Sequence, residues 1–208
     1  PPSNATMAVN ERLSLLERYH DWQGLVEALE ETIGGEQEPG AKARLHLWLA
    51  RVLGTHFLEN AKALKHFQEA YKLDPGLLEA LEEARAIYWE LGKLNMVQKL
   101  LELELKALPE SPARSELFRE LGDVLCDLGD YERATESYAR ALQSSDGRPG
   151  EVPELLEDVQ VGQGDWQKRV QKIVGAADAE RDPSRRAGLL LRAARLVRRF
   201  DPTSVEAI

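Results

Sequence analysis

The sequence predicts an all-α fold, an α-solenoid in which antiparallel helix pairs stack into a right-handed superhelix. Three observations lead to this prediction. Almost every segment of the 208 residues carries apolar side chains with the 3.6-residue period of a helix, and none shows the two-residue alternation of a strand. Glycine and proline interrupt the pattern regularly and leave helices about 10 to 17 residues long. Residues 21–51 also match residues 165–195 at a constant offset of 144, as expected for an array of similar units.

The glycines and prolines divide the chain into five helical hairpins and one further helix. Residues 1–6 are small and polar, so we assign them to a tag or a disordered start, which implies that the natural N-terminus can be missing. One solenoid domain is predicted over 7–208. Its hairpins are expected at 6–43, 44–77, 78–114, 115–149 and 150–187, followed by an unpaired helix at 184–199.

The hairpin at 115–149 has the most regular spacing of small and bulky residues. Small residues at Gly122 and Ala134 allow its two helices to approach closely, and Phe118 and Tyr138 fill the space beside them. Gly129 gives the turn a backbone conformation that other residues disfavour. The full pattern is Phe118-x2-Leu121-Gly122-x2-Leu125, then Leu128-Gly129-Asp130-Tyr131, then Ala134-x3-Tyr138-x2-Ala141.

This spacing resembles the 34-residue tetratricopeptide repeat (TPR) family. The hairpins at 44–77 and 78–114 follow the same register but are degenerate, because Arg51 and Arg85 stand where Gly122 stands. Trp22 and Trp166, 144 residues apart, each open the second helix of a hairpin. We expect both to pack between neighbouring repeats.

The TPR resemblance implies that the first helix of each hairpin lines a concave groove that binds a protein segment. Tryptophan is a frequent binding anchor, although packing is an equally good explanation for the two tryptophans at groove positions. Acidic residues dominate the other groove positions, which favours a basic or amphipathic basic partner segment. The candidate groove residues are Trp48, Glu79, Glu82, Trp89, Glu90, Glu116, Arg119, Asp123 and Asp127.

The last helix is strongly amphipathic, with an apolar face opposite an arginine-rich arc. No second helix follows it in the sequence, so we expect its apolar face to contact another molecule, for example in a weak homo-oligomer. The alternative is that residues 203–208 fold back over it. The candidate contact residues are Leu189, Arg192, Leu196, Arg199 and Phe200.

Composition and charge restrict the remaining functions. The net charge is −9, and residues 1–164 hold 30 acidic and 17 basic side chains, whereas phosphate recognition needs a basic face. The single cysteine, Cys126, lies near no histidine in sequence, and the four histidines form no pattern of metal ligands. We therefore expect no metal, no cofactor, no small-molecule substrate and no enzymatic activity.

The predicted function is a protein–protein interaction module. Two alternatives remain open: a structural scaffold that self-associates end to end in a larger assembly, and, less favoured because of its charge, a helical-repeat nucleic-acid binder. No apolar segment is long enough to span a membrane, so a cytoplasmic location is expected. The excess of arginine over lysine indicates a bacterial source.

Overall fold

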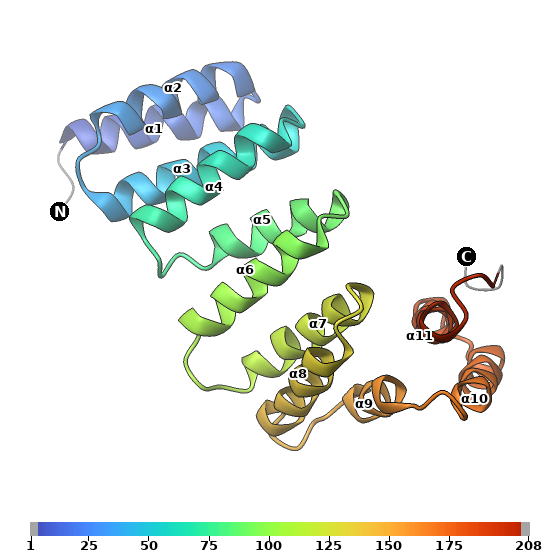
Figure 1. Cartoon of the computed structure of the whole chain (residues 1–208). Helices are drawn as coiled ribbons and strands as arrows, with labels where there is room; N and C mark the ends of the chain where they lie inside the picture. Colours follow the sequence, from blue (N-terminus) through green and yellow to red (C-terminus); the bar gives the residue numbers. More distant parts are fainter. Residues whose placement is uncertain (1–3, 205–208) are drawn as a thin grey trace. The chain divides into compact units, whose positions relative to one another are not determined.

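The computed structural model describes residues 4–204, which form eleven helices and no strand (Figure 1). The all-α prediction is therefore confirmed. α1 begins at Asn4, within the segment assigned to a tag or disordered start, and residues 1–3 lie outside the described part. So do residues 205–208, most of the tail that could cover the last helix. The chain divides into two compact units, Pro1–Ala107 and Leu108–Ile208.

Unit 1 is a stack of three helical hairpins. Each helix packs on the next one along the chain, from α1 to α6, as in a solenoid. Leu25, Leu29 and Leu49 are among the fully buried side chains of its core. The helices are α1 (Asn4–Arg18), α2 (Trp22–Gly35), α3 (Pro39–His56), α4 (Asn60–Leu73), α5 (Glu79–Glu90) and α6 (Leu94–Ala107).

Unit 2 contains the hairpin α7–α8, the single helix α9 and the packed pair α10–α11. α7 packs on α8 and α8 on α9, while α11 packs on α10 and also contacts α9. α9 is short, with 9 residues, whereas α1, α3, α5 and α7 have 12 or more. The helices are α7 (Ala113–Asp127), α8 (Tyr131–Ser144), α9 (Val152–Gln160), α10 (Trp166–Ala179) and α11 (Pro183–Phe200).

The hairpin α7–α8 has the close helix contact that its sequence predicts. A Cβ atom added to Gly122 would lie 2.5 Å from the ring of Tyr138, so only glycine fits there. Gly129 closes the turn with a φ of 82°, in the left-handed region. Asp130 then begins α8, because its side chain accepts a hydrogen bond from the backbone N–H of Arg133.

The 144-residue offset seen in the sequence is also present in the structure. The bounds of α2 and α10 differ by 144 residues at both ends, and so do those of α3 and α11. Glu36 and Glu180 end α2 and α10, and each accepts hydrogen bonds from the next two backbone N–H groups. Unit 2 therefore repeats, in α10 and α11, the local structure of α2 and α3.

Trp22 and Trp166, which the sequence predicts to pack between neighbouring repeats, make equivalent contacts. Trp22 stacks on His56 with ring centroids 3.6 Å apart, and Trp166 stacks on Phe200 at 5.8 Å. His56 and Phe200 are also separated by 144 residues. Each tryptophan thus joins the start of one helix to the end of the next.

Candidate functional site

Trp48 lies between two cavities on the surface of unit 1. Its half-buried side chain borders two cavities, one of about 680 Å³ between α1, α2 and α3, and one of about 500 Å³ between α1, α3 and α5. Apolar side chains line the first cavity, among them Leu13 and Leu45, and an ion pair of Arg12 with Glu31 at 3.2 Å borders it. The cavities follow the first helices of three successive hairpins.

Charged side chains line the second cavity. Arg51 donates from Nη2 to Glu79 at 2.6 Å and from Nε to Glu83 at 2.8 Å, and so joins α3 to α5. The hydrogen bond to Glu83, and then the one to Glu79, raises the pKa of Arg51, which remains a fixed positive charge. Glu17 of α1 and Arg44 of α3 line the same cavity. The surface therefore offers carboxylates and guanidinium groups around an indole.

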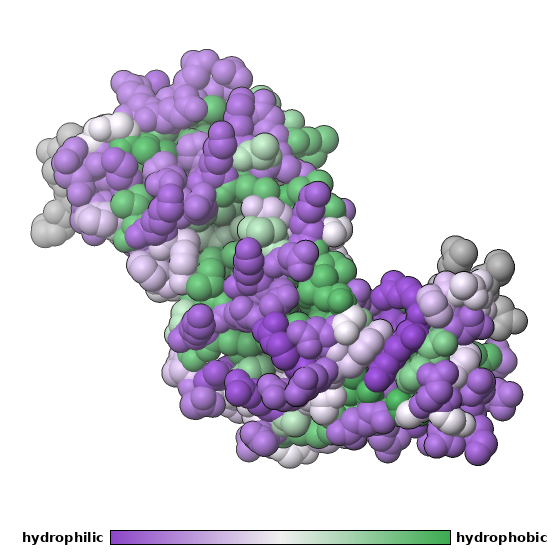
Figure 2. All heavy atoms as spheres, in the orientation of Figure 1, coloured by the Kyte–Doolittle hydropathy of each residue, from purple (hydrophilic) through white to green (hydrophobic). Residues whose placement is uncertain are grey.

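The other predicted groove residues of unit 1 lie on α5 and are accessible. Glu82 and Glu90 are exposed, and no described side chain forms an ion pair with either. Trp89 is 48% exposed, the highest value among the four tryptophans. In the view of unit 1 in Figure 2, hydrophilic side chains cover most of the helices and apolar atoms show between them.

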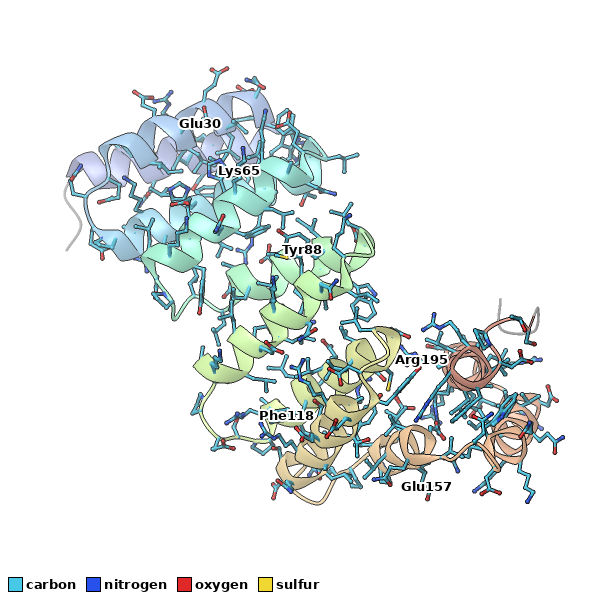
Figure 3. The ribbon with its side chains drawn as sticks, in the orientation of Figure 1. Glu30, Lys65, Tyr88, Phe118, Glu157 and Arg195 are labelled. Atoms are coloured by element: carbon cyan, nitrogen blue, oxygen red, sulfur yellow. The ribbon has the colours of Figure 1, made fainter. Side chains whose placement is uncertain are left out.

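The predicted groove residues of unit 2 are already paired within the unit. Arg119 of α7 bonds Glu116 at 3.0 Å and Asp123 at 2.6 Å. Arg195 of α11 bonds Asp123 at 3.2 Å and Asp127 at 2.9 Å, and Arg198 bonds Asp127 at 2.9 Å. Figure 3 shows Arg195 extending from α11 toward α7. Asp123 and Asp127 of α7 are thus paired with arginines of α11, a basic amphipathic helix of the same chain, whereas Glu116 is paired with Arg119 of α7 itself.

These residues therefore lie on two units, with Trp48, Glu79, Glu82, Trp89 and Glu90 in unit 1 and Glu116, Arg119, Asp123 and Asp127 in unit 2. That they form one continuous groove stays a prediction.

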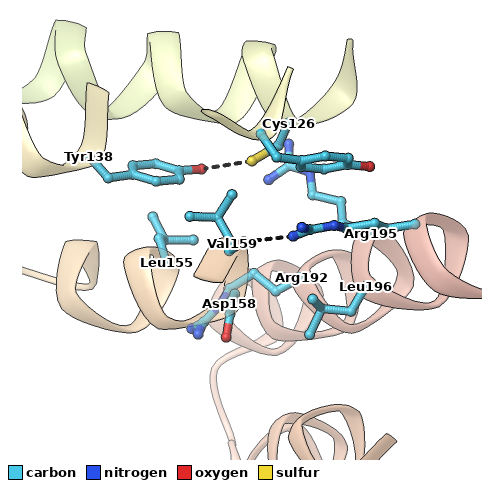
Figure 4. Close-up of a pocket in the computed structure, with 10 residues that line it drawn as sticks. Cys126, Tyr138, Leu155, Asp158, Val159, Arg192, Arg195 and Leu196 are labelled. Carbon is cyan, nitrogen blue, oxygen red and sulfur yellow. Dashed lines mark hydrogen bonds and ion pairs between the residues drawn. The ribbon is translucent and has the colours of Figure 1, made fainter. Parts of the chain in front are cut away.

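A small cavity in unit 2 lies beneath Arg195 and the ring of Tyr138 (Figure 4). Its volume of about 30 Å³ holds roughly one water molecule, which is too little for an organic ligand. Tyr138 donates to Asp123 at 2.8 Å, and its oxygen lies 3.8 Å from the sulfur of Cys126. Burial raises the pKa of Cys126 to about 11, so the thiol is protonated at neutral pH and is a poor nucleophile.

No protein-family model matches the sequence, and no curated protein matches it either. Solved structures do match. A tetratricopeptide repeat protein from Parabacteroides merdae superposes with a TM-score of 0.65 at 17% identity, covering 94% of this chain and 73% of that one. PilF of Pseudomonas aeruginosa gives 0.53 at 18%, covering 99% and 97%. YrrB, a TPR protein, gives 0.51 at 22%, covering 88% of each chain.

The fold is the TPR fold. The sequence pattern had predicted it, and the structural similarity confirms it over most of the chain. At these levels of identity the similarity establishes the TPR architecture and leaves the binding residues to be argued from this chain.

The last helix of the TPR array, α11, places most of its predicted contact residues inside unit 2. Leu196 and Arg192 are buried, and Arg192 donates to Asp158 at 2.7 Å. Arg199 lies over the ring of Tyr131 at 3.9 Å and donates to the carbonyl of Val159, while Leu189 and Phe200 are half-buried against α10. The role of these residues in contacts with another molecule stays a prediction.

The most exposed apolar side chains of α11 are instead Leu190 and Leu191. Neither residue is among the contact residues that the sequence predicts for this helix. The 144-residue match is the signal that marks both as contact positions. Their counterparts His46 and Leu47 are buried between α3 and α4.

Among residues 4–204, no group of three or more histidine, cysteine, aspartate or glutamate side chains is placed to hold a metal ion. Within the same residues, no helix combines the length and apolar character required to cross a bilayer.

Proposed function

We propose that this protein is a protein–protein interaction module that binds a segment of a partner on the surface of unit 1 around Trp48. The observation that carries the proposal is the pair of adjoining cavities, of about 680 and 500 Å³, that share this one indole. Cavities of this size accommodate side chains of a bound segment, and a half-buried tryptophan between them is a suitable anchor. YrrB is described as a TPR protein with an unusual peptide-binding site, which is consistent with this use of the fold.

We further propose that the bound segment is basic or amphipathic basic. Glu82 and Glu90 stand without a described ion pair near Trp89, and Glu17 and Glu79 line the second cavity. Unit 2 offers a precedent for the chemistry, because Asp123 and Asp127 of its helix α7 bind Arg195 and Arg198 of α11. Complementary charge mainly increases the association rate and makes binding sensitive to salt.

The proposal can be tested with a labelled amphipathic helical peptide of leucine and lysine, and with a counterpart in which glutamate replaces lysine. We expect only the basic peptide to bind. Trp48→Ala should weaken its binding tenfold or more, as for an anchor residue. Glu82→Lys should weaken it several-fold at 50 mM salt and less at 300 mM salt, because salt screens exposed charges.

Glu136→Lys is the matched control for Glu82→Lys, since Glu136 is an exposed glutamate on α8 of unit 2 and should not affect binding. Circular dichroism confirms that each variant is folded. If Trp48→Ala unfolds, Arg44→Glu is used in its place; it adds a negative charge to the wall of both cavities and should strengthen binding of the basic peptide. Stronger binding of the acidic peptide, or equal binding by the wild type and both cavity variants, would contradict the proposal.

A further inference from the structure

The face of α11 that carries Leu190 and Leu191 is open, although the equivalent face of α3 is closed. Leu190 and Leu191 are 43% and 53% exposed, whereas His46 and Leu47, 144 residues earlier, are 8% and 4% exposed. The two helices have equivalent bounds, equivalent preceding helices and equivalent stacked tryptophans. The difference therefore comes from what lies on this one face.

In unit 1 the face of α3 is covered by α4. Nδ1 of His46 lies 2.9 Å from Nδ1 of His66, and a Cβ atom on Gly54 would lie 3.6 Å from the Cβ atom of Ala63. α4 presents a stripe of one aromatic residue between two small ones, Ala63, Phe67 and Ala70, and all three are buried. This small–aromatic–small stripe lets the two helices pack closely over Leu47.

On α11 only one half of the corresponding face is covered. Arg195 and Arg198, which stand where Arg51 and Gly54 stand on α3, are bonded to Asp127 of α7 at 2.9 Å. This contact occupies the C-terminal half of the face and leaves the side chain of Arg195 only 18% exposed. The N-terminal half, with Leu190 and Leu191, has no counterpart of α4 among residues 4–204 (Figure 1).

We propose that this N-terminal half of α11 binds an amphipathic helix of a partner protein whose stripe repeats the chemistry of α4: a small residue, an aromatic residue four positions later, and a second small residue three positions after that. The site is separate from the surface around Trp48, and its test does not depend on that proposal.

The occupant is not a second copy of the chain in the same conformation. The described helices with such a stripe already use it internally, since Ala63, Phe67 and Ala70 of α4 are buried, as are Ala134, Tyr138 and Ala141 of α8. A second copy could supply the stripe only by opening one of its own hairpins. A partner helix with a free stripe has no such cost.

The chain itself supplies a probe for the experiment: a synthetic peptide of residues 57–77, which contains α4 and its flanking turns. The full-length protein is labelled at its leucine methyl groups and titrated with the peptide. We expect saturable shifts of the Leu190 and Leu191 methyl signals and none at Leu29, which is buried between other helices. A peptide with Phe67→Glu should bind at least tenfold more weakly.

Leu191→Glu in the protein should abolish the shifts without unfolding it, because Leu191 is exposed. Leu15→Glu is the matched control, since Leu15 is also exposed, 44%, but lies on α1 of unit 1. Absence of shifts up to the solubility limit of the peptide, or equal shifts with the Phe67→Glu peptide, would overturn the proposal. So would a dimer in sedimentation that Leu191→Glu converts to monomer, because the occupant would then be a second copy.

Discussion

Arg85 and Glu104 form a buried ion pair at two positions where the most regular repeat has small residues. Nε of Arg85 donates to Oε1 of Glu104 at 2.8 Å, and the side chains are only 16% and 6% exposed. Arg85 stands at the position of Gly122, and Glu104 at that of Ala141. The degenerate hairpin α5–α6 thus has a charged contact between its helices at positions where α7–α8 has small residues.

The first prediction concerns the removal of one partner of this pair. Arg85→Ala or Glu104→Ala leaves the other charge buried and should reduce the free energy of unfolding by about 3 kcal/mol. The double substitution Arg85→Met with Glu104→Leu removes both charges and should cost clearly less than either single one. Urea unfolding measures all three, and a double variant less stable than both single variants would contradict the prediction.

The second prediction concerns Asp158, which accepts hydrogen bonds from two arginines of unit 2, the buried Arg192 and the half-buried Arg169. Arg169 donates to it at 2.5 Å and Arg192 at 2.7 Å. Asp158→Ala should reduce the free energy of unfolding by roughly 3–5 kcal/mol, because it leaves buried Arg192 without its carboxylate and leaves Arg169 with only the exposed Glu157 as a carboxylate partner. Glu157→Ala is the matched control, since exposed Glu157 pairs with Arg169 from the solvent side and should cost less than about 1 kcal/mol.

Hydrogen exchange shows where the effect of Asp158→Ala acts. We expect faster exchange in α9, α10 and α11, which the three residues join, and unchanged exchange in α2 and α3 of unit 1. Equally faster exchange in both units would show that Asp158, Arg169 and Arg192 do not hold these helices together. An equal loss of unfolding free energy in Asp158→Ala and Glu157→Ala would show the same.

The third prediction concerns the close contact between Gly122 and Tyr138. Gly122→Ala places a methyl group 2.5 Å from the tyrosine ring and should destabilise the protein by about 1–3 kcal/mol through overpacking. Gly175→Ala in α10 is the control, because nothing lies within 4 Å of its added Cβ atom. That substitution should stabilise the protein by about 0.5–1 kcal/mol through helix propensity.

A double-mutant cycle identifies the cause of this effect. If the clash with the ring is responsible, the cost of Gly122→Ala should fall to near zero in a Tyr138→Ala background. An unchanged cost in that background would show that the backbone of α7, and not the contact with α8, requires glycine.

Local sequence signals were sufficient to predict the helices and their turns. Asp21-Trp22 and Asp165-Trp166, with Pro39 and Pro183, predicted two copies of one helix–turn–helix unit, because caps, turns and N-terminal prolines act over a few residues. The structure gives the two copies equivalent bounds. The contact between Gly122 and Tyr138 was predictable for the same reason, since the spacing of one repeat determines it.

Contacts between distant helices could not be predicted in this way. The sequence assigned Asp123 and Asp127 to an open groove and Arg192 to an external contact surface, but the structure pairs all three within unit 2. The contact of Arg195 with α7 spans 68 residues and depends on how the shorter helix α9 positions α11. Such distances result from the packing of several helices, which periodicity does not encode.

The last prediction concerns the histidine pair between α3 and α4. The Nδ1 atoms of His46 and His66 lie 2.9 Å apart, so one ring donates and the other accepts, which requires the accepting ring to be neutral. Burial lowers the pKa of both, and for His46 the proximity of His66 lowers it further. Lys42 acts in the same direction on His46, while Glu69 opposes the effect on both rings and Glu30 opposes it on His66.

Because both pKa values in the folded state lie below the usual 6.5, the unfolded chain binds more protons than the folded one at mildly acidic pH. Stability should therefore be fully present above about pH 7 and should decrease as the pH falls through 6.5 toward the lowered values. The double substitution of His46→Leu with His66→Leu should lose this part of the pH dependence. Urea unfolding at pH 7.5 and 5.5 measures the difference, and an equal slope in wild type and double variant would show that the pair does not couple protonation to the stability of the α3–α4 hairpin.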